Sequence, residues 1–498
     1  MAPAVRAFLV EQQMPLVAGV DSSTQSTKVE LRDVFTGQVV GSGRADHPAA
    51  APPRSEQAPS AWWAALVEAM AKALTAADRR ATPADVGAIA VAAQQHGLVV
   101  LDRGKEVLRP AKLWNDTESA EDSDRLIGRL GANGWVDACG SVPGPSFTVS
   151  KLAWLGRREP ETFARIAHVL LPHDWLTFRL TGQLVTDRGD ASGTGYWSPG
   201  ENKYRLGLLS LVDSEMDWAP TLPTVLGPWD QAGTLTRAAA EQLGLPVDTP
   251  VAAGTGDNMA GALGAGLRPG EVGISIGTSG TVFSRCERPC ADPTGTIAGF
   301  ADATGRFLPL VCTLNASLVT ESIGRILAVD HSGLDRLALA APSGSGGLVL
   351  VPYLAGERTP NRPDATGTLC GIRTDLTREW LARAAFEGVV CSLLDGLDAL
   401  TAAGVPTGAG PIVLLGGGAR SAGYRQVLAS LSGRPVTVPT DGESVSAGAA
   451  LQAGVLVTHT DPDVMADAWG LRQGRVTAPV EDGDSSDAVR RRFAAARG

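Results

Sequence analysis

The stretch LVAGVDSSTQSTKVEL, residues 16–31, contains two apolar segments on either side of a turn rich in serine and threonine. Its first segment has the pattern of a buried strand and ends at Asp21. The stretch VGISIGTSGTV, residues 272–282, repeats this strand–turn–strand pattern around Gly277-Thr278-Ser279-Gly280. Two such units indicate an internal duplication with its seam near residue 258, and hence two lobes with a cleft between them.

Strand and helix signals alternate along the rest of the chain, which is typical of an α/β fold. We expect strands at 16–20, 28–34, 38–43, 86–93, 271–276, 281–285, 348–351 and 412–415. Long helices are expected at about 60–77, 379–401, 422–431 and 446–457, and Ser60 is the expected N-cap of the first.

The composition narrows the class of protein. A chain of 498 residues is long enough for two to four domains, and a hydrophobic content of 44% is ordinary for a soluble globular protein. The formal net charge of -10 argues against non-specific nucleic-acid binding, although a bound metal and backbone N–H groups could still attract an anionic cosubstrate. No stretch approaches the ~18 uninterrupted apolar residues of a membrane span, so we expect no membrane partner.

The six cysteines are scattered along the chain. The close pair Cys286 and Cys290 has no second pair or nearby histidine that would complete a tetrahedral metal site. We therefore expect reduced, structural thiols, as in a cytoplasmic protein. Residues 1–14 are expected to be a disordered extension, and an upstream start-site assignment is the alternative for residues 1–13.

The first turn has the chemistry of a phosphate site. Its small residues allow successive backbone N–H groups to converge on phosphate oxygens, and Ser23, Thr24 and Lys28 add side-chain donors. Asp21, at the end of the strand, could hold Mg²⁺ through water, because this ion keeps much of its hydration shell. An ordinary hairpin turn is the alternative for this segment taken alone.

The second turn offers Gly277, Thr278 and Ser279 for the same purpose, and the pair of turns is a stronger indication than either alone. Neither is a Walker A loop, because the pattern GxxxxGK[ST] does not occur. The glycine run GGGAR ends at Arg420, and its Gly417 and Gly418 would let backbone approach a ring or a phosphate closely. A plain strand-to-helix turn is the alternative there.

Polar side chains suited to sugar hydroxyls stand at the ends of predicted strands. Gln95 and His96 follow a buried strand, and amide and imidazole groups can both donate and accept hydrogen bonds. Trp114 begins another aromatic–amide–carboxylate set. Asp257 and Asn258 follow a glycine-flanked turn, where the Asp257 carboxylate could accept a proton from a substrate hydroxyl. The alternatives are structural: a core histidine, and helix N-caps at Asp257 and in the Trp114 set.

Taken together, these motifs resemble those of the FGGY carbohydrate kinase family. The resemblance runs from about residue 16 to beyond residue 454 and rests on the order and spacing of its pieces. They are the first turn, QHG (95–97), LWND (113–116), TVSKLAWL (148–155), LPHDW (171–175), GDN (256–258), SIGTSG (275–280), PYLAGERTP (352–360) and GGGAR (416–420).

The resemblance implies an actin-like fold, with two ribonuclease-H-like domains around a cleft: residues 15–257 for the sugar and 258–498 for ATP. It implies that Asp257 is the general base and that Asp21 lies near metal and phosphates. Sugar contacts from Gln95, His96 and Asn258 and ATP contacts from Thr278 and Gly417 are implied as well. ATP and Mg²⁺ are then the cosubstrate and the cofactor, and a homodimer is suggested because relatives are often dimers.

The motifs are most similar to those of family members that phosphorylate D-xylulose, which implies phosphate transfer to the terminal O5. The sequence departs from its relatives in three ways, and the last two bear on the identity of the sugar. Ser23 and Ser26 stand where many relatives have glycine, Glu118 stands where such members often have Arg, and Gln95 replaces a Met of some relatives. A kinase for another ketose, a polyol or a sugar acid is therefore an alternative. An actin-like nucleotide-binding scaffold and a sugar-responsive regulator are others, although no basic helix-turn-helix segment lies at either end.

Overall fold

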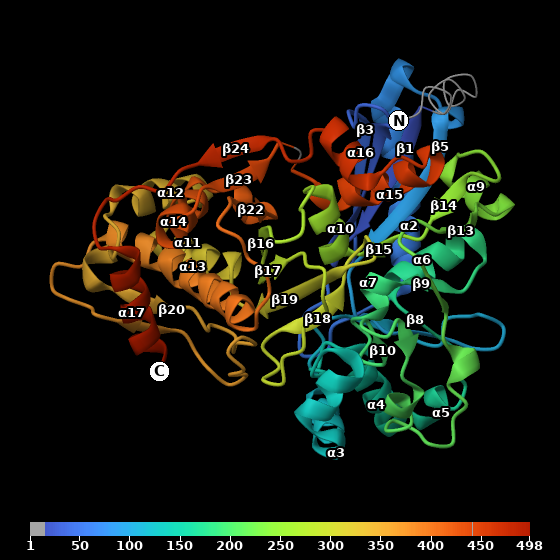
Figure 1. Cartoon of the computed structure of the whole chain (residues 1–498), viewed down its shortest axis with the longest axis horizontal. Helices are drawn as coiled ribbons and strands as arrows, with labels where there is room; N and C mark the ends of the chain where they lie inside the picture. Colours follow the sequence, from blue (N-terminus) through green and yellow to red (C-terminus); the bar gives the residue numbers. More distant parts are fainter. Residues whose placement is uncertain (1–14, 441) are drawn as a thin grey trace.

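The computed structural model describes residues 15–440 and 442–498 and contains two seven-stranded mixed sheets with helices on their faces (Figure 1). The first sheet has the order β13 (Gln231–Thr234), β14 (Pro250–Ala252), β5 (Val86–Ala93), β1 (Leu16–Ser22), β2 (Ser26–Asp33) and β3 (Val39–Asp46), and β15 (Thr255–Gly256) pairs with β5. The second has the order β18 (Ala298–Ala301), β19 (Phe307–Thr313), β17 (Gly280–Ser284), β16 (Val272–Ile276), β22 (Ile412–Leu415), β23 (Val436–Pro439) and β24 (Gly474–Thr477). The predicted α/β class is confirmed, and the predicted extension at residues 1–14 lies outside the described residues.

The two sheets share their central connectivity. β1 pairs antiparallel with β2 and parallel with β5, and β16 pairs antiparallel with β17 and parallel with β22. The turns at 23–25 and 277–279 therefore occupy equivalent places in the two sheets, as the repeated strand–turn–strand pattern predicts. The predicted strand at 348–351 forms as β20 (Val349–Val351), which pairs with β21 (Thr368–Cys370) outside the two large sheets.

Helices cover both faces of the first sheet because its strand residues are apolar on both sides. Ala18 and Val20 pack in one core with Trp62 of α2 (Pro59–Ala77), whereas Val17 faces the core that holds α15 (Ser444–Thr458). Helix α2 begins at Pro59, so the prediction that Ser60 is its N-cap is wrong. Proline suits the first helical position because its φ is already fixed near the helical value. The other predicted long helices form as α13 (Arg378–Ala402), α14 (Ala422–Ser432) and α15.

The chain returns to the first sheet near its end. Helix α15 packs against β1 and β5 and also against α10 (Asp257–Gly264). Glycines make this helix pair close: a Cβ at Gly264 would lie 1.9 Å from the Ser444 carbonyl oxygen, and one at Gly448 would lie 2.0 Å from that of Ala260. Helix α10 thus packs closely against a helix from near the end of the chain. The division at residues 257 and 258 stays a prediction, and α15 packs on the sheet of the preceding half.

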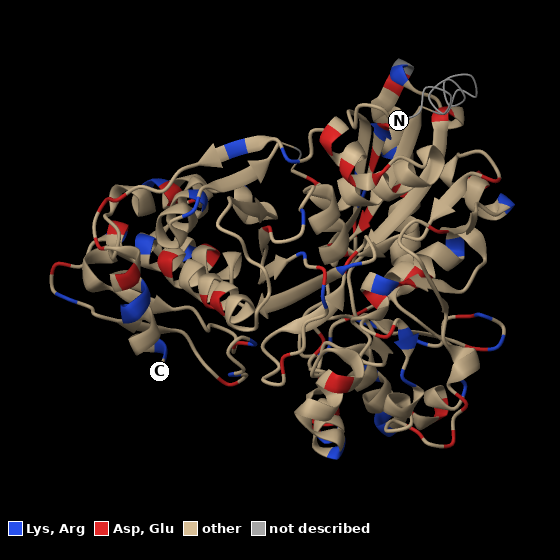
Figure 2. Cartoon of the chain, in the orientation of Figure 1, with Lys and Arg blue, Asp and Glu red and all other residues tan. Residues whose placement is uncertain are grey.

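Surface charge and hydropathy are unremarkable for a chain of this class. Lys and Arg are interspersed with Asp and Glu over both halves (Figure 2). Within the described ranges, no helix is long and apolar enough to cross a membrane. All six cysteines are free thiols.

Candidate active site

The two candidate catalytic carboxylates lie at the carboxyl ends of two parallel strands, β1 and β15, that both pair with β5. β1 pairs with β5 through Ser22 and Ala93, and β15 pairs with β5 through Gly256 and the same Ala93. This register brings Asp21 and Asp257 to one edge of the first sheet, close enough for the charge of Asp257 to raise the pKa of Asp21. In open α/β sheets this edge is where ligands bind.

Asp257 is the first residue of α10, and Gly256, not Asp257, is the N-cap. Its Oδ1 accepts hydrogen bonds from the backbone N–H and the Nδ2 of Asn258, at 2.8 and 2.9 Å. Burial raises the pKa of Asp257 to about 6, although these two hydrogen bonds favour the ionised form. A carboxylate of this kind is mostly ionised at neutral pH and is a better proton acceptor than an ordinary aspartate.

The Asp21 carboxylate is buried, and neighbouring groups compensate its negative charge only in part. Its Oδ2 lies 4.0 Å from Lys28 Nζ, and its Oδ1 has no hydrogen-bond partner among the described residues. Burial raises the pKa of Asp21 to about 7; Lys28 opposes this shift, and Asp257 and Glu443 add to it. A cation beside Oδ1 would supply the missing charge, so the Asp21 carboxylate fits the predicted Mg²⁺ ligand.

Glu443 lies between two of the predicted phosphate-side residues, Lys28 and Arg420. It was not predicted from the sequence. It precedes α15, accepts a hydrogen bond from Lys28, and lies 3.7 Å from the guanidinium of Arg420. The Arg420 side chain is 81% exposed and is therefore accessible to a ligand. No local motif marks Glu443 in the sequence, because it comes from a loop more than 400 residues after the first turn.

Two of the predicted donors in the first turn, Ser23 and Thr24, make hydrogen bonds within the protein. Ser23 Oγ donates to the Ser26 carbonyl at 3.0 Å, and Thr24 Oγ1 donates to Gln94 Oε1 at 3.2 Å. Trp114, predicted as a substrate contact, donates its indole N–H to Thr24 Oγ1 at 2.9 Å. The indole therefore anchors the first turn through its polar atom.

Of the predicted sugar-side residues, Gln95 reaches Asp257 through Asn258. Gln95 Oε1 accepts from Asn258 Nδ2 at 3.0 Å, and Gln95 Nε2 is buried without a partner in the described part of the chain. His96 Nδ1 lies 2.7 Å from the Gly193 carbonyl, which can only accept, so Nδ1 carries the proton and Nε2 is an acceptor. Burial, assisted by the charges of Lys151 and Arg358, lowers the pKa of His96 to about 3 and keeps the ring neutral.

Lys151 holds the backbone of His96, a role that was not predicted. It is fully buried, and its Nζ donates to the His96 carbonyl at 2.9 Å and to the Ser146 carbonyl. His96 has a positive φ of 65° and stacks on Phe147 at 5.1 Å between ring centroids, so its orientation is fixed from both sides. Lys151 lies in the TVSKLAWL motif, which carried the family resemblance without an assigned role.

Glu118, one of the departures from related sequences, is bound in an ion-pair cluster. The ammonium of Lys112 bonds to Glu118, lies 3.0 Å from Asp116 and 3.2 Å from Glu56, and sits 3.8 Å from the ring centroid of Trp154. The three carboxylates could otherwise hold a metal ion, but Lys112 already supplies the positive charge among them.

The second sheet carries the predicted ATP-binding residues just after the carboxyl ends of two of its strands. Ser275 of β16 pairs with Leu415 of β22, so the segment Gly277–Ser279 and the glycine run 416–420 follow adjacent parallel strands. Thr278 and Gly417 are exposed, as ligand contacts require. Gly418 is buried instead, and a Cβ there would lie 2.4 Å from Cγ2 of Ile276, so this glycine serves packing.

One hydrogen bond links the two sets. Thr281 Oγ1, next to the second turn, donates to Asn258 Oδ1 at 3.4 Å. The residue after the candidate base thus contacts both the sugar-side Gln95 and the second strand–turn–strand unit. The arrangement places a candidate proton acceptor between side chains that could bind hydroxyls and turns that could bind phosphate, an order that phosphoryl transfer to an alcohol would need.

Comparisons with known proteins identify the family of the chain. The N-terminal domain model of the FGGY family of carbohydrate kinases matches residues 16–264, and its C-terminal domain model matches residues 272–457. The chain is 47% identical to the xylulose kinase of Streptomyces rubiginosus over 94% of this chain and 93% of that protein, and 35% identical to that of Haemophilus influenzae over 87% and 89%. The crystal structure of xylulose kinase from Bifidobacterium adolescentis superposes with a TM-score of 0.83 at 40% identity, covering 97% of this chain and 100% of that one. The chain belongs to the FGGY family of carbohydrate kinases, which use ATP to phosphorylate sugars.

Proposed function

We propose that this kinase transfers the γ-phosphate of ATP to O5 of D-xylulose, giving D-xylulose 5-phosphate and ADP. The observation that carries the proposal is the position of Asp257, whose neighbour Asn258 contacts Gln95 on one side and Thr281 on the other. The xylulose kinases to which the chain is similar support the choice of sugar.

On the sugar side, three groups would orient the substrate. His96 Nε2 accepts a hydrogen bond from a hydroxyl, and the free Nε2 hydrogens of Gln95 donate to another. Asp257 accepts the proton of O5–H as O5 bonds to the γ-phosphorus, and the bond from that phosphorus to the β–γ bridging oxygen breaks. The raised pKa of Asp257, about 6, suits it to this transfer near neutral pH.

On the phosphate side, the second turn and the segment at Gly417 would bind ATP, since Thr278 and Gly417 are exposed at the ends of adjacent strands. Lys28 and Arg420 supply positive charge next to the first turn. Mg²⁺ held by Asp21, through water, would neutralise the charge that develops on the phosphate oxygens.

The alternative is a different acceptor for the same chemistry: another ketose, a polyol or a sugar acid. The binding of Glu118 to Lys112 removes one reason for it, because the carboxylate already has a partner. A panel of D-xylulose, L-xylulose, D- and L-ribulose, glycerol, gluconate and L-fuculose, with Mg²⁺-ATP and ADP release as the signal, separates these. We expect D-xylulose to give the highest kcat/KM, and another sugar in first place would overturn the assignment.

We also propose the cellular setting of the enzyme. The net charge of -10 and the free cysteines support a cytoplasmic enzyme that binds no nucleic acid. A homodimer stays a prediction from the family, and light scattering on the purified chain tests it.

A further inference from the structure

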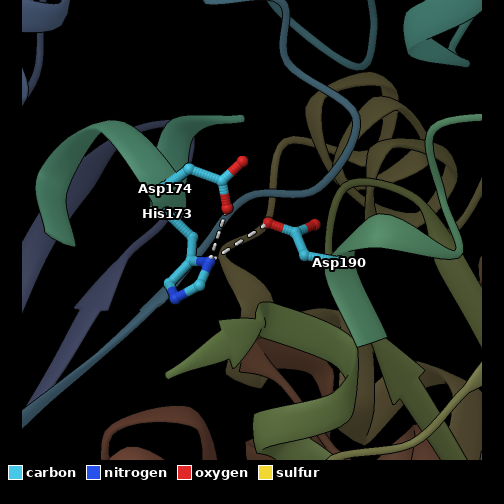
Figure 3. A group of neighbouring side chains, drawn as sticks. All are labelled: His173, Asp174 and Asp190. Atoms are coloured by element: carbon cyan, nitrogen blue, oxygen red, sulfur yellow. Dashed lines mark hydrogen bonds and ion pairs between the residues drawn. The ribbon is translucent and has the colours of Figure 1, made fainter. Parts of the chain in front are cut away.

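A buried cluster of one histidine and two aspartates contacts the backbone that leads to Asp257. His173 and Asp174 come from α6 (Pro172–Thr181), and Asp190 comes from α7 (Arg188–Ala191) (Figure 3). At most 1% of each residue is exposed. His173 Nδ1 lies 3.1 Å from Asp174 Oδ1 and 3.7 Å from Asp190 Oδ2. The role proposed above for Asp257 does not use these groups.

The hydrogen bonds of His173 determine its protonation. Its Nε2 lies 2.7 Å from the Ala253 carbonyl oxygen, which can only accept, so Nε2 must carry a hydrogen. Its Nδ1 faces the carboxylate of Asp174, which also accepts from the backbone N–H of Leu171. With a carboxylate opposite Nδ1, this nitrogen carries a hydrogen too. Burial alone would lower the pKa of His173, but the hydrogen bond and charge of Asp174, the charge of Asp187 and the hydrogen bond to Ala253 together raise it.

Asp187 holds the same segment by a second contact. It is the N-cap of α7, and its carboxylate accepts from the backbone N–H groups of Gly189 and Asp190 and from the hydroxyl of Thr255, at 2.7 Å. Burial raises the pKa of Asp187, and the charge of His173 and these three hydrogen bonds oppose that shift by favouring the ionised form. The hydrogen bonds of His173 and Thr255 therefore fix residues 253 and 255, four and two positions before Asp257.

Asp190 completes the charge balance. Both its carboxylate oxygens are buried without a hydrogen-bond partner among the residues described. Burial, and the charges of Asp174, Asp187 and Asp257, raise the pKa of Asp190 well above its ordinary value and so favour its neutral form. In that form Asp190 adds no repulsion to the Asp257 carboxylate.

The segment between these contacts has little freedom to move elsewhere. Gly254 has a φ of 71°, and a Cβ there would lie 2.5 Å from His173 Nε2 and 2.3 Å from the Val91 carbonyl oxygen. The imidazole thus packs directly on the backbone that leads to Asp257. Because hydrogen bonds from an ionised donor are stronger than neutral ones, an imidazolium holds the Ala253 carbonyl more firmly than a neutral ring would.

We propose that His173, as an imidazolium, and Asp187 are positioning residues that set the place of the Asp257 carboxylate through Ala253 and Thr255. This inference rests on the proposed function, in which Asp257 accepts the substrate proton. A shift of about 1 Å in a reacting group can cost about 10²-fold in rate, so losing one of these contacts should lower kcat. Substrate affinity should change little, because neither residue contacts the sugar or ATP in the proposed arrangement.

The test compares Thr255→Val, which removes the hydroxyl at nearly constant volume, with Thr255→Ser, which retains it. We expect Thr255→Val and His173→Gln to lower kcat about 10–100-fold while both KM values change less than about 3-fold. Thr255→Ser and the exposed control His331→Gln should stay within about 3-fold of the wild-type kcat. Circular dichroism and the melting temperature establish that each variant is folded. A folded Thr255→Val with wild-type kcat would overturn the proposal.

A second readout follows the ring of His173 itself. In enzyme labelled with ¹⁵N-histidine, two-dimensional spectra that correlate ring nitrogens and carbon-bound hydrogens distinguish an imidazolium from a neutral ring, and His173→Gln identifies the signal. We expect an imidazolium at pH 7.5. The three side chains could instead bind a metal through Nδ1, since their ligand atoms lie within 4.8 Å of one another. A neutral ring, or one equivalent of tightly bound metal by elemental analysis, would overturn the imidazolium.

Failure here and failure of the proposed function give different results. All kcat values are measured with the sugar that ranks first in the panel, so a wrong sugar leaves the comparison of Thr255→Val with Thr255→Ser intact. Wild-type enzyme that turns over no sugar would contradict the proposed function, while the nitrogen spectra would still report on His173.

Discussion

The turns after β1 and β16 occupy equivalent places in two sheets of the same topology, yet their chemistry differs. The first has a buried carboxylate, Asp21, whose pKa is raised to about 7, beside the Lys28–Glu443 ion pair. The second has no ionisable side chain between Gly277 and Gly280 and exposes the Thr278 hydroxyl. The same strand–turn–strand scaffold thus occurs twice. We propose that the first turn is suited to a cation and the second to backbone and hydroxyl contacts with a nucleotide.

The neighbours of each turn account for this difference. The second turn is fixed by its own carbonyls: those of Gly277 and Thr278 accept from the backbone N–H groups of Ser317 and Ala316 at the start of α11 (Ser317–Leu327). The first turn also has a backbone contact, from the His47 N–H to the Gln25 carbonyl, but side chains hold it as well: Gln57 donates to the Thr24 carbonyl and the indole of Trp114 donates to Thr24 Oγ1. The first turn therefore depends more on residues whose substitution changes hydrogen bonding directly.

The largest effect should come from the residue between the two turns. Asp257→Asn keeps the shape and removes the proton acceptor, so kcat should fall by about 10²–10⁴. D-xylulose binding, measured by calorimetry, should weaken far less, because Gln95 and His96 remain. The exposed Asp375→Asn serves as the matched control. Turnover of folded Asp257→Asn within about 3-fold of wild type would contradict its role as base.

Asp21→Asn tests whether the first turn is the metal-binding one. Removing the ligand charge should lower kcat about 10–10²-fold and raise the Mg²⁺ concentration needed for half-maximal rate. The KM for D-xylulose should change little. A loss of sugar binding equal to the loss of turnover would argue for a structural role instead.

The same substitution should stabilise the protein. The folded-state pKa of Asp21, about 7, lies above the unfolded value near 3.8, so its contribution is complete below pH 3.8 and is lost as the pH rises through 7. At pH 8, without Mg²⁺, Asp21→Asn should therefore raise the free energy of unfolding by about 1–3 kcal/mol, and by less at pH 5. Thermal melts at the two pH values check this. Equal melting-temperature shifts at both would rule out a strained carboxylate.

Thr278→Val tests the second turn and should have a smaller effect. Removing one neutral hydroxyl contact, worth about 0.5–1.5 kcal/mol, should raise the KM for ATP about 2–10-fold. The Mg²⁺ requirement and the KM for D-xylulose should not change, in contrast to Asp21→Asn. A raised KM for D-xylulose would show that the two turns do not divide the work as proposed.

Ser23→Gly should have the smallest effect. Its hydroxyl donates to the Ser26 carbonyl within the turn and is not free to donate to phosphate. We expect kcat/KM for ATP to stay within about 3-fold of wild type. A larger fall would mean that Ser23 turns its hydroxyl to the nucleotide when ATP binds.

The duplicated fold was predictable because it repeats a local pattern. The strands at residues 16–22 and 272–276 are apolar runs bounded by small polar turns, and this pattern holds within each segment. The packing of α15 on the first sheet was not predictable in the same way. It depends on contact between Gly448 and Ala260, nearly 190 residues apart, and small residues alone do not say which helix they approach.

The site shows the same contrast between local and distant signals. Asp21, Gln95 and Asp257 could be predicted because each follows a strand, and parallel strands end at one edge of a sheet. Glu443 and Lys151 could not be assigned roles, since each acts through a partner distant in sequence: Lys28 for the one and His96 for the other. The sugar contact of Trp114 stays a prediction, and the hydrogen bond from its indole N–H to Thr24 had no signal in the local sequence.

In the proposed mechanism, the two halves of the chain together transfer the γ-phosphate of ATP to one hydroxyl of the sugar bound beside Asp257. The most direct test is the product of D-xylulose and Mg²⁺-ATP, examined by ³¹P and ¹³C NMR. We predict one phosphate monoester whose phosphorus couples to C5, formed in equal amount to ADP. Phosphate on another carbon, or inorganic phosphate released while D-xylulose is unchanged, would contradict the account.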